Sequence, residues 1–302
     1  WVFSEKPEFH VIPTDTINIH IDKDALLRSG IMLPKTIRHL KGEDLKDAIP
    51  DKLYIPLTDI RMLTKVDLLM LEMLANCNWE RPLYLAISVG SVSKLKFDNY
   101  FVQEGLAFRF TPFDYKKWGD VGENRLYAVD VERLYDNVMN RYKYGGLDTP
   151  GLYLDETTLR TCWYHRRLFA QLAKELIAQG DNERAKKVLA YAEQVIPGYN
   201  VPETHESGSY DIATAYAALG EKTKAVTLAV HLIAEAEDYI NWAFSLKGNR
   251  IEMVRNDCIY KFWQWNQYNE LLKKIDGEKY KESNRRFEEK YALFAPTMNY
   301  KN

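Results

Sequence analysis

The chain has 302 residues, about twice the ~150 residues of a typical domain, so two domains are the first expectation. Hydrophobic residues make up 46% and charged residues 28%, an ordinary globular balance that excludes a wholly disordered chain. Lys and Arg number 41 against 43 Asp and Glu, a formal net charge of −2. This balance argues against a nucleic-acid partner, which would call for a strongly basic surface.

The sequence carries no recognisable catalytic or metal-binding motif. Three cysteines, at 77, 162 and 258, lie far apart, and neither they nor the six histidines show a zinc-ligand spacing. No phosphate-binding glycine loop, nucleophile elbow or dinucleotide fingerprint occurs. We therefore expect no metal ion and no cofactor, and we assign no catalytic residue.

The first part of the chain predicts a small domain with both strands and helices. Residues 16–21 alternate between apolar and polar side chains, as in a half-buried strand, and residues 53–57 predict a second strand. Thr64 and Asp67 have the spacing of a capping box, in which each side chain satisfies a free backbone donor. The helix that follows is expected to bury Val66, Leu69, Met70, Met73 and Leu74.

The apolar run from Leu83 to Val89 predicts a buried strand, which gives a strand, a helix and a strand within ~35 residues. This order indicates a βαβ crossover in one sheet. A further strand is expected at 106–111 and a helix through 131–139. Pro150-Gly151 is a turn signal that marks the domain boundary. The predicted domains are residues 1–150 and 151–302.

After Asp155, a helix N-cap by its side-chain chemistry, helical periodicity replaces the strand patterns. Two apolar helical stripes are separated at Gly180, and two more are separated at Gly220, 40 residues later. This internal repeat resembles tetratricopeptide repeats, whose unit has 34 residues, with a longer linker through residues 198–202. The predicted fold class is therefore α+β: a small α/β N-terminal domain with a βαβ unit, followed by all-α tetratricopeptide-like hairpins.

The last helices leave two interpretations open. Residues 256–274 are rich in Trp and Tyr, which favours a capping helix buried on the last hairpin or, alternatively, a surface that stacks on a sugar. Residues 279–293 interleave Lys and Arg with Glu, which indicates a helix with a solvated face.

One stretch carries a family resemblance. Residues 74–86, Leu-Ala-Asn-Cys-Asn-Trp-Glu-Arg-Pro-Leu-Tyr-Leu-Ala, resemble the Asn-Trp-x-Arg-Pro-Ile-Tyr-Phe signature of a Bacteroidetes family of multi-spanning membrane proteins. Residues 103–109, 135–148 and 152–156 fit the same family in the same order. The N-terminal half of that family is similar to protein O-mannosyltransferases, which take sugars from lipid-phosphate donors.

The resemblance implies that the chain is the C-terminal region of such a protein, on the periplasmic side of the inner membrane. Its partners would be the membrane domain of the same polypeptide and a protein or glycan acceptor. Trp79, Arg81 and Tyr84 would then contact the membrane domain or the acceptor. Alternatively, the signature is a structural corner between helix and sheet, in which Trp79 fills a gap.

The first helices of a hairpin array offer a second candidate binding surface, around Arg166, Arg167 and Lys174. The preferred interpretation is a non-catalytic accessory domain of a membrane glycosyltransferase-like protein that binds or orients an acceptor. Two alternatives remain open: a self-contained soluble sugar-active enzyme, and a structural assembly module of an envelope complex.

Overall fold

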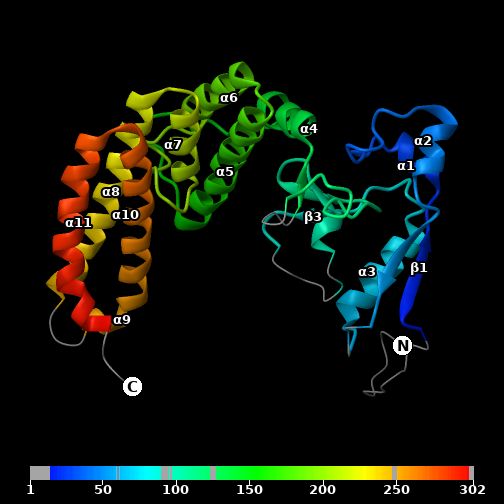
Figure 1. Ribbon diagram of the computed structural model, residues 1–302, viewed down its shortest axis with the longest axis horizontal. Helices are drawn as coiled ribbons and strands as arrows, with labels where there is room; N and C mark the ends of the chain where they lie inside the picture. Colours follow the sequence, from blue (N-terminus) through cyan, green and yellow to red (C-terminus); the bar gives the residue numbers. More distant parts are fainter. Residues whose placement is uncertain are drawn as a thin grey trace. The chain divides into compact units, whose positions relative to one another are not determined.

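A computed structural model describes residues 14–58, 60, 62–89, 95, 97–122, 127–246 and 250–298. The chain divides into two compact units, Trp1–Asn137 and Val138–Asn302. The first unit combines short helices with two small sheets, and the second is helical (Figure 1). The predicted α+β class, with an all-α C-terminal part, is confirmed.

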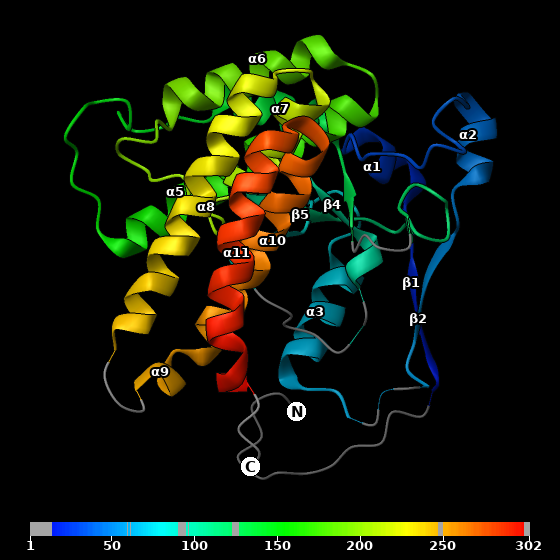
Figure 2. The same ribbon diagram turned by 60° about the vertical axis from the view of Figure 1, so that its left-hand side comes forward.

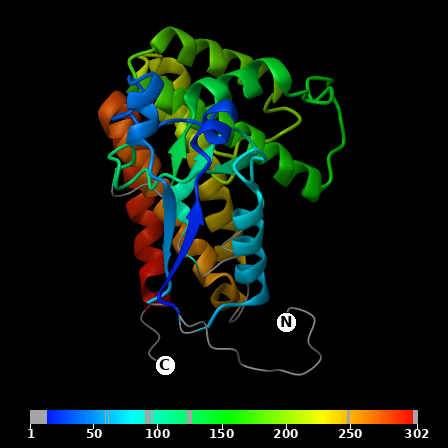
Figure 3. The same ribbon diagram turned by 90° about the vertical axis from the view of Figure 1, so that its right-hand side faces the viewer.

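The first sheet is a two-stranded antiparallel ribbon of β1 (Thr16–His20) and β2 (Lys52–Pro56), which confirms both predicted strands. Ile17 lies opposite Ile55, and Ile19 lies opposite Leu53. Because side chains alternate along a strand, this register gathers the four apolar side chains on one face. They share a core with α1 (Lys23–Arg28) and α3 (Lys65–Asn76), and β1 and α3 lie side by side in Figure 3. Helix α2 (Gly42–Ala48) precedes β2.

The second sheet has the strand order β3-β5-β4-β6, with β3 (Tyr84–Ala86), β4 (Phe101–Gln103), β5 (Ala107–Phe110) and β6 (Ala128–Val129). A 3-10 turn (Asp98–Tyr100) leads into β4, and only the β4–β6 pair is parallel. The predicted βαβ crossover is wrong, because β2 pairs with β1 while β3 pairs antiparallel with β5. Helix α3 therefore connects two different sheets.

The strand predicted as buried over residues 83–89 is also shorter and more exposed than expected. It covers only Tyr84–Ala86 and is an edge strand with β5 as its partner. Tyr84 is 49% exposed and Val89 is 40% exposed. An edge strand has a neighbouring strand on one side only. The apolar composition of residues 83–89 therefore suggested more burial than the structure shows.

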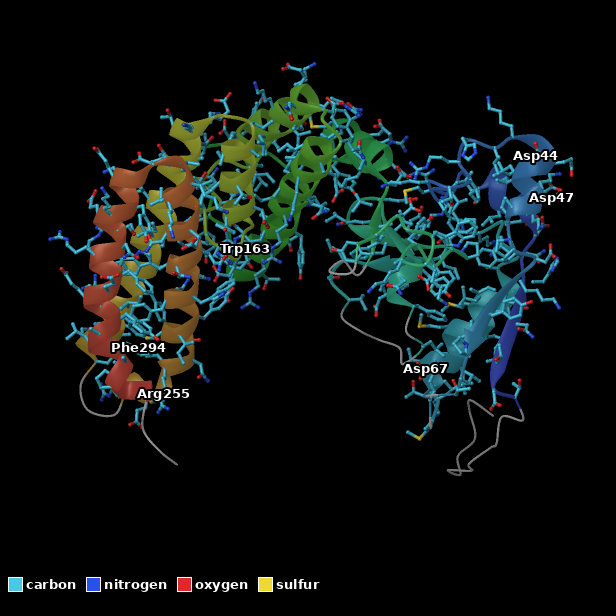
Figure 4. The ribbon with its side chains drawn as sticks, in the orientation of Figure 1. Asp44, Asp47, Asp67, Trp163, Arg255 and Phe294 are labelled. Atoms are coloured by element: carbon cyan, nitrogen blue, oxygen red, sulfur yellow. The ribbon has the colours of Figure 1, made fainter. Side chains whose placement is uncertain are left out.

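Helix α3 begins with the predicted capping box. The Thr64 hydroxyl accepts from the Asp67 amide at 3.3 Å, and the Asp67 carboxylate accepts from the Thr64 amide at 2.7 Å. The buried face contains Asp67, Leu71 and Leu74, and Asp67 is labelled in Figure 4. The predicted apolar face is wrong for Val66, Leu69 and Met73, which are 46%, 49% and 51% exposed. The predicted face and the buried face of α3 are offset by about one residue, roughly 100° around the helix. The apolar periodicity of the sequence fits both faces.

The first unit ends with α4 (Val131–Asp136), and a π-helical turn (Asn137–Arg141) continues from it. The second unit then contains seven helices among its described residues: α5 (Glu156–Ala178), α6 (Asn182–Val195), α7 (Ser209–Ala218), α8 (Lys222–Ser245), α9 (Arg250–Met253), α10 (Arg255–Ile275) and α11 (Gly277–Met298). Helices α5 and α6 pack together, as do α7 and α8, with left-handed Gly180 and Gly220 at their turns. Helix α10 packs on α8 and pairs with α11, so these long helices run side by side (Figure 2).

The last helix is more than a solvated surface. Phe294 of α11, labelled in Figure 4, is fully buried, and Ser283 is 3% exposed. The Ser283 hydroxyl accepts from the Trp265 indole at 2.8 Å and donates to the Asn269 amide oxygen at 2.6 Å. The interleaved charges of residues 279–293 lie on the outer side of α11. Its inner side packs on α10 through buried apolar side chains and the hydrogen bonds of Ser283.

Residues 138–150, which the sequence assigns to the first domain, are fastened to the helices of the second unit. The Tyr144 ring packs against Phe169 of α5. The Tyr199 hydroxyl donates to the Asp148 carbonyl at 2.6 Å, and the Asn200 amide donates to the Leu147 carbonyl at 2.8 Å. These contacts explain why the division between the compact units falls near residue 137, ahead of the turn at Pro150-Gly151.

Candidate functional site

Trp79, the centre of the signature, is a buried corner residue. Its indole is 6% exposed, stacks on Phe110 and donates to the His20 carbonyl at 2.7 Å. Asn78 and Trp79 have φ values of 50° and 60°, a left-handed conformation that is uncommon outside glycine. These features match the structural-corner alternative. The burial of the indole favours this structural role over a direct contact with a partner, and the contact predicted for Trp79 stays a prediction.

The surroundings of Arg81 hold almost no cavity. Arg81 is exposed, and the adjacent cavity beside Trp79, Pro82 and Arg109 measures only about 10 Å³. This volume is about that of one water probe, so it cannot hold a sugar or a peptide. The exposed Arg81 side chain remains a candidate contact for another protein surface.

Tyr84 belongs to a polar cluster on one face of the second sheet. Its hydroxyl donates to the Glu104 carboxylate at 2.8 Å, and Arg133 of α4 approaches the same carboxylate at 3.0 Å. Arg109 lies opposite Tyr84 in the β3–β5 register, and its guanidinium is 3.6 Å from Glu104. Glu104 is 5% exposed and Arg109 3%, so this is a buried charge cluster with Tyr84 at its exposed rim.

The cluster ties the sheet to the end of α1. Arg109 donates to the Ser29 carbonyl at 2.9 Å, and Arg133 donates to the Gly30 carbonyl at 2.5 Å. Burial, and then the hydrogen bond to Glu104, raises the pKa of Tyr84 above its usual value. The phenol therefore stays protonated and keeps donating at neutral pH. Sequence reasoning found Tyr84 but missed its partners, because only the strand register brings them to one face.

Arg166 is buried in the second unit and binds the linker between α6 and α7. It is 3% exposed, and its guanidinium donates to the carbonyls of Ile196 (3.0 Å), Val201 (2.5 Å) and Pro202 (2.8 Å) and to the Ser207 hydroxyl (3.1 Å). Burial lowers the pKa of Arg166 to about 10, so the side chain is charged at neutral pH. These contacts give Arg166 a structural role. Arg166 also lines a groove of the second unit, so its part in acceptor binding stays a prediction.

The two other predicted binding residues of α5 lie on the surface. Arg167 is exposed and donates through Nε to the Glu206 carbonyl at 2.7 Å, so it also holds the linker. Lys174 is exposed on α5, away from these contacts. Gly208 packs closely on Arg167: a Cβ there would lie 2.9 Å from the Arg167 Cγ, and its φ is +85°. Both the close approach and the left-handed backbone favour glycine at this position.

A groove of about 490 Å³ lies among α6, α7, α8 and the linker. Its size is in the range of ligand-binding clefts, 300–1,000 Å³. One wall comes from the α6–α7 linker that Arg166 holds. Apolar side chains and a few charged ones line it: Leu189, Ala192, Ile196, Ile212 and Leu228, with Glu193, Glu203, Lys224 and His231. The sequence predicted the helices of the groove and, among its lining residues, named only Arg166 as a binding residue.

The groove has an ordered polar edge. Lys224 pairs with the Glu193 carboxylate at 2.9 Å, and the Tyr216 hydroxyl donates to the same carboxylate at 2.5 Å. Lys224 also lies 5.0 Å from the centre of the Tyr216 ring. Burial, and then the bond to Glu193, raises the pKa of Tyr216, so the phenol remains a donor. The edge therefore presents both charge signs beside an apolar floor, an arrangement suited to a polypeptide or a glycan.

The aromatic helix α10 fits both of the interpretations left open. Phe262, Trp265 and Tyr268 are 0–3% exposed, which makes the helix a buried part of the last hairpins. Tyr260 and Trp263 are 44% and 49% exposed and stack with their rings 13° from parallel. The sugar-stacking interpretation is therefore limited to these two rings and remains a prediction.

The described residues contain neither a candidate metal site nor a candidate membrane span. No group of three or more His, Cys, Asp or Glu side chains in the described ranges is placed to hold a metal ion. None of the helices described is long and apolar enough to span a membrane.

The chain is thus an α+β protein. Its first unit contains the Trp79 corner and the buried charge cluster around Glu104, and its second unit consists of helical hairpins with a groove. Residues 2–132 match the family described as TMEM260-associated domain 2, and the match supports a TMEM260-like family. It covers nearly all of the first unit, including Trp79, Tyr84 and Glu104, whereas the hairpins and their groove lie outside it. Neither the curated proteins nor the solved structures gave a match.

Replacing Arg166 with methionine should destabilise the second unit. The four linker oxygens would lose their buried donors, so we expect the free energy of unfolding to fall by about 3 kcal/mol. Urea denaturation measures it. The matched control, Lys174→Met on the exposed side of α5, should change stability by less than about 0.5 kcal/mol. Equal effects of the two changes would contradict the structural role of Arg166.

Replacing His165 with phenylalanine should not lower the free energy of unfolding. The variant should gain in stability relative to the wild type as the pH falls. The imidazole lies among tyrosine rings, its Nδ1 is buried without a hydrogen-bond partner among the described residues, and burial lowers the pKa of His165 below 6.5. As the pH falls through 6.5 the unfolded chain takes up the proton first, so the wild-type fold loses stability. Denaturation at about pH 7.5 and pH 5.5 should show the advantage of the variant growing at the lower value. A constant difference between the two proteins would count against this reasoning.

Proposed function

We propose that the chain is a non-catalytic accessory region of a TMEM260-like membrane protein, located on the periplasmic side of the inner membrane, that binds or orients a protein or glycan acceptor. The observation that carries the proposal is the family match over residues 2–132. The membrane domain of the same polypeptide is then the first partner. The resemblance of residues 74–86 to a membrane-protein family similar to protein O-mannosyltransferases supports the same assignment.

The first unit has the character of a rigid attachment. The signature residues form the buried Trp79 corner, and Glu104 joins the sheet to α4 through Arg133. Buried charge clusters of this kind hold one geometry when all members are paired. At the rim of this framework Arg81 and Tyr84 are exposed, and they are the side chains we assign to the contact with the membrane domain.

The acceptor site is assigned to the groove of the second unit. The groove combines an apolar floor with the Glu193–Lys224 pair at its edge. Holding an acceptor there raises its effective concentration near a membrane active site without requiring chemistry in this chain. Lys174 and the exposed part of Arg167, on the neighbouring helix α5, extend the surface available to a protein acceptor.

Fractionation of native cells with an antibody against this chain tests the assignment to a membrane protein. We expect a membrane-bound species well above 35.3 kDa that a protease clips only after the outer membrane is opened. A cytoplasmic species near 35.3 kDa would contradict the proposal, and so would turnover of an activated sugar by the chain alone.

A blocked groove tests acceptor binding separately. Thr227 is exposed and lines the groove, so Thr227→Trp in the full-length protein should fill it without disturbing the core. We expect glycosylation of envelope proteins, measured by glycan staining of cell extracts, to fall at least tenfold, equivalent to about 1.4 kcal/mol of binding. The control, Ala190→Trp on the exposed side of α6, should behave as wild type. Equal glycosylation in both variants would exclude the groove as the acceptor site.

A further inference from the structure

An apolar stripe on the outer side of α3 has no partner within the described part of its own unit. Met62, just before the helix, is 55% exposed, and Val66, Leu69 and Met73 are 46%, 49% and 51% exposed. Large apolar side chains scattered singly on a surface are ordinary, but three aligned on one face of α3, with Met62 just ahead of the helix, indicate an interaction site. The inner side of the same helix is already used, since Leu71 and Leu74 belong to the core.

The stripe has the spacing of a coiled-coil seam. Val66, Leu69 and Met73 are separated by three and four residues, the alternating intervals of the a and d positions in a heptad. With Val66 and Met73 at a and Leu69 at d, the core residues Leu71 and Leu74 fall at f and b, outside the seam. A helix with this pattern can pair with a second helix while its inner face stays in the core.

The charges beside the stripe specify which helix fits. Lys65 and Glu72 occupy the two g positions and are both exposed. In an antiparallel pair the g positions of the two helices face each other. A second α3 in antiparallel orientation therefore brings Lys65 opposite Glu72 of the partner subunit, twice by symmetry. The same register sets Val66 against Leu69 of the partner subunit, and it places Met73 beside the start of the partner subunit's α3.

We propose that α3 is a homodimer contact, in which two copies of the chain pair antiparallel through Val66, Leu69 and Met73 and through two Lys65–Glu72 ion pairs. One helix stripe is small beside the ~800 Å² per partner of a standard interface, so the dimer is weak in solution. Anchoring two copies in one membrane would strengthen it by raising their effective concentration. The inference is independent of acceptor binding, since α3 lies in the first unit and the groove in the second.

Charge exchange on the full chain tests the pairing. Sedimentation equilibrium from micromolar to millimolar concentration measures the dissociation constant of the wild type and of Lys65→Glu, Glu72→Lys and the double variant. Each single change places like charges opposite each other, so we expect about tenfold weaker dimers. The double variant exchanges both signs and should return to within about twofold of wild type. Glu183→Lys, on exposed α6 surface, is the control and should leave the constant unchanged.

The apolar seam is tested by Leu69→Glu, which should leave the protein monomeric at every concentration while circular dichroism shows an unchanged fold. A monomeric wild type would overturn the proposal, and the stripe would then be covered by another part of the chain, a lipid surface or a different protein. A dimer that none of the α3 changes affects would overturn it as well, because its contact would lie elsewhere. Failure of the double variant to restore binding would exclude the antiparallel register.

Discussion

A charged guanidinium inside a protein must find oxygen acceptors, and Arg166 finds all of its four in one short stretch of chain. These acceptors lie between the end of α6 and the start of α7, so Arg166 fixes the path of the linker that joins the two hairpins, and Arg167 adds a bond to the Glu206 carbonyl. The linker in turn forms one wall of the groove, and its Asn200 binds the carbonyls of Leu147 and Thr149.

The first unit also contains a buried charge, of the opposite sign. Glu104 is a buried carboxylate, and it is compensated by two arginines and the Tyr84 hydroxyl. Each of the arginines also bonds to carbonyls at the end of α1. Because a buried charge without partners is strongly unfavourable, these contacts form together or not at all. This coupling joins the sheet, α1 and α4 into one framework.

Local signals in the sequence identified most of the fold. The capping box at Thr64, the alternation of residues 16–21 and the breaks at Gly180 and Gly220 depend on neighbours within a few residues, and all three are confirmed. The errors concern long-range partners. Nothing local reveals that β3 pairs with β5, or which of two apolar faces of α3 packs inward. For Trp79 the sequence left a buried corner and a surface contact open, because Trp suits both, and it indicated only a surface contact for Arg166. The other groove-lining residues were not identified as a group, because they come from α6, α7, α8 and the linker.

Gly208 allows a close approach between the linker and α5 because it has no side chain. Its missing side chain lets the linker rest against the backbone of Arg167, immediately before α7 begins, and the same residue takes the left-handed turn that starts that helix. An added methyl group would lie 2.9 Å from Cγ and 3.3 Å from Cα of Arg167, so either the Arg167 side chain or the linker would have to move. Because the linker forms one wall of the groove, a single carbon atom at this position would act on the groove from outside its lining.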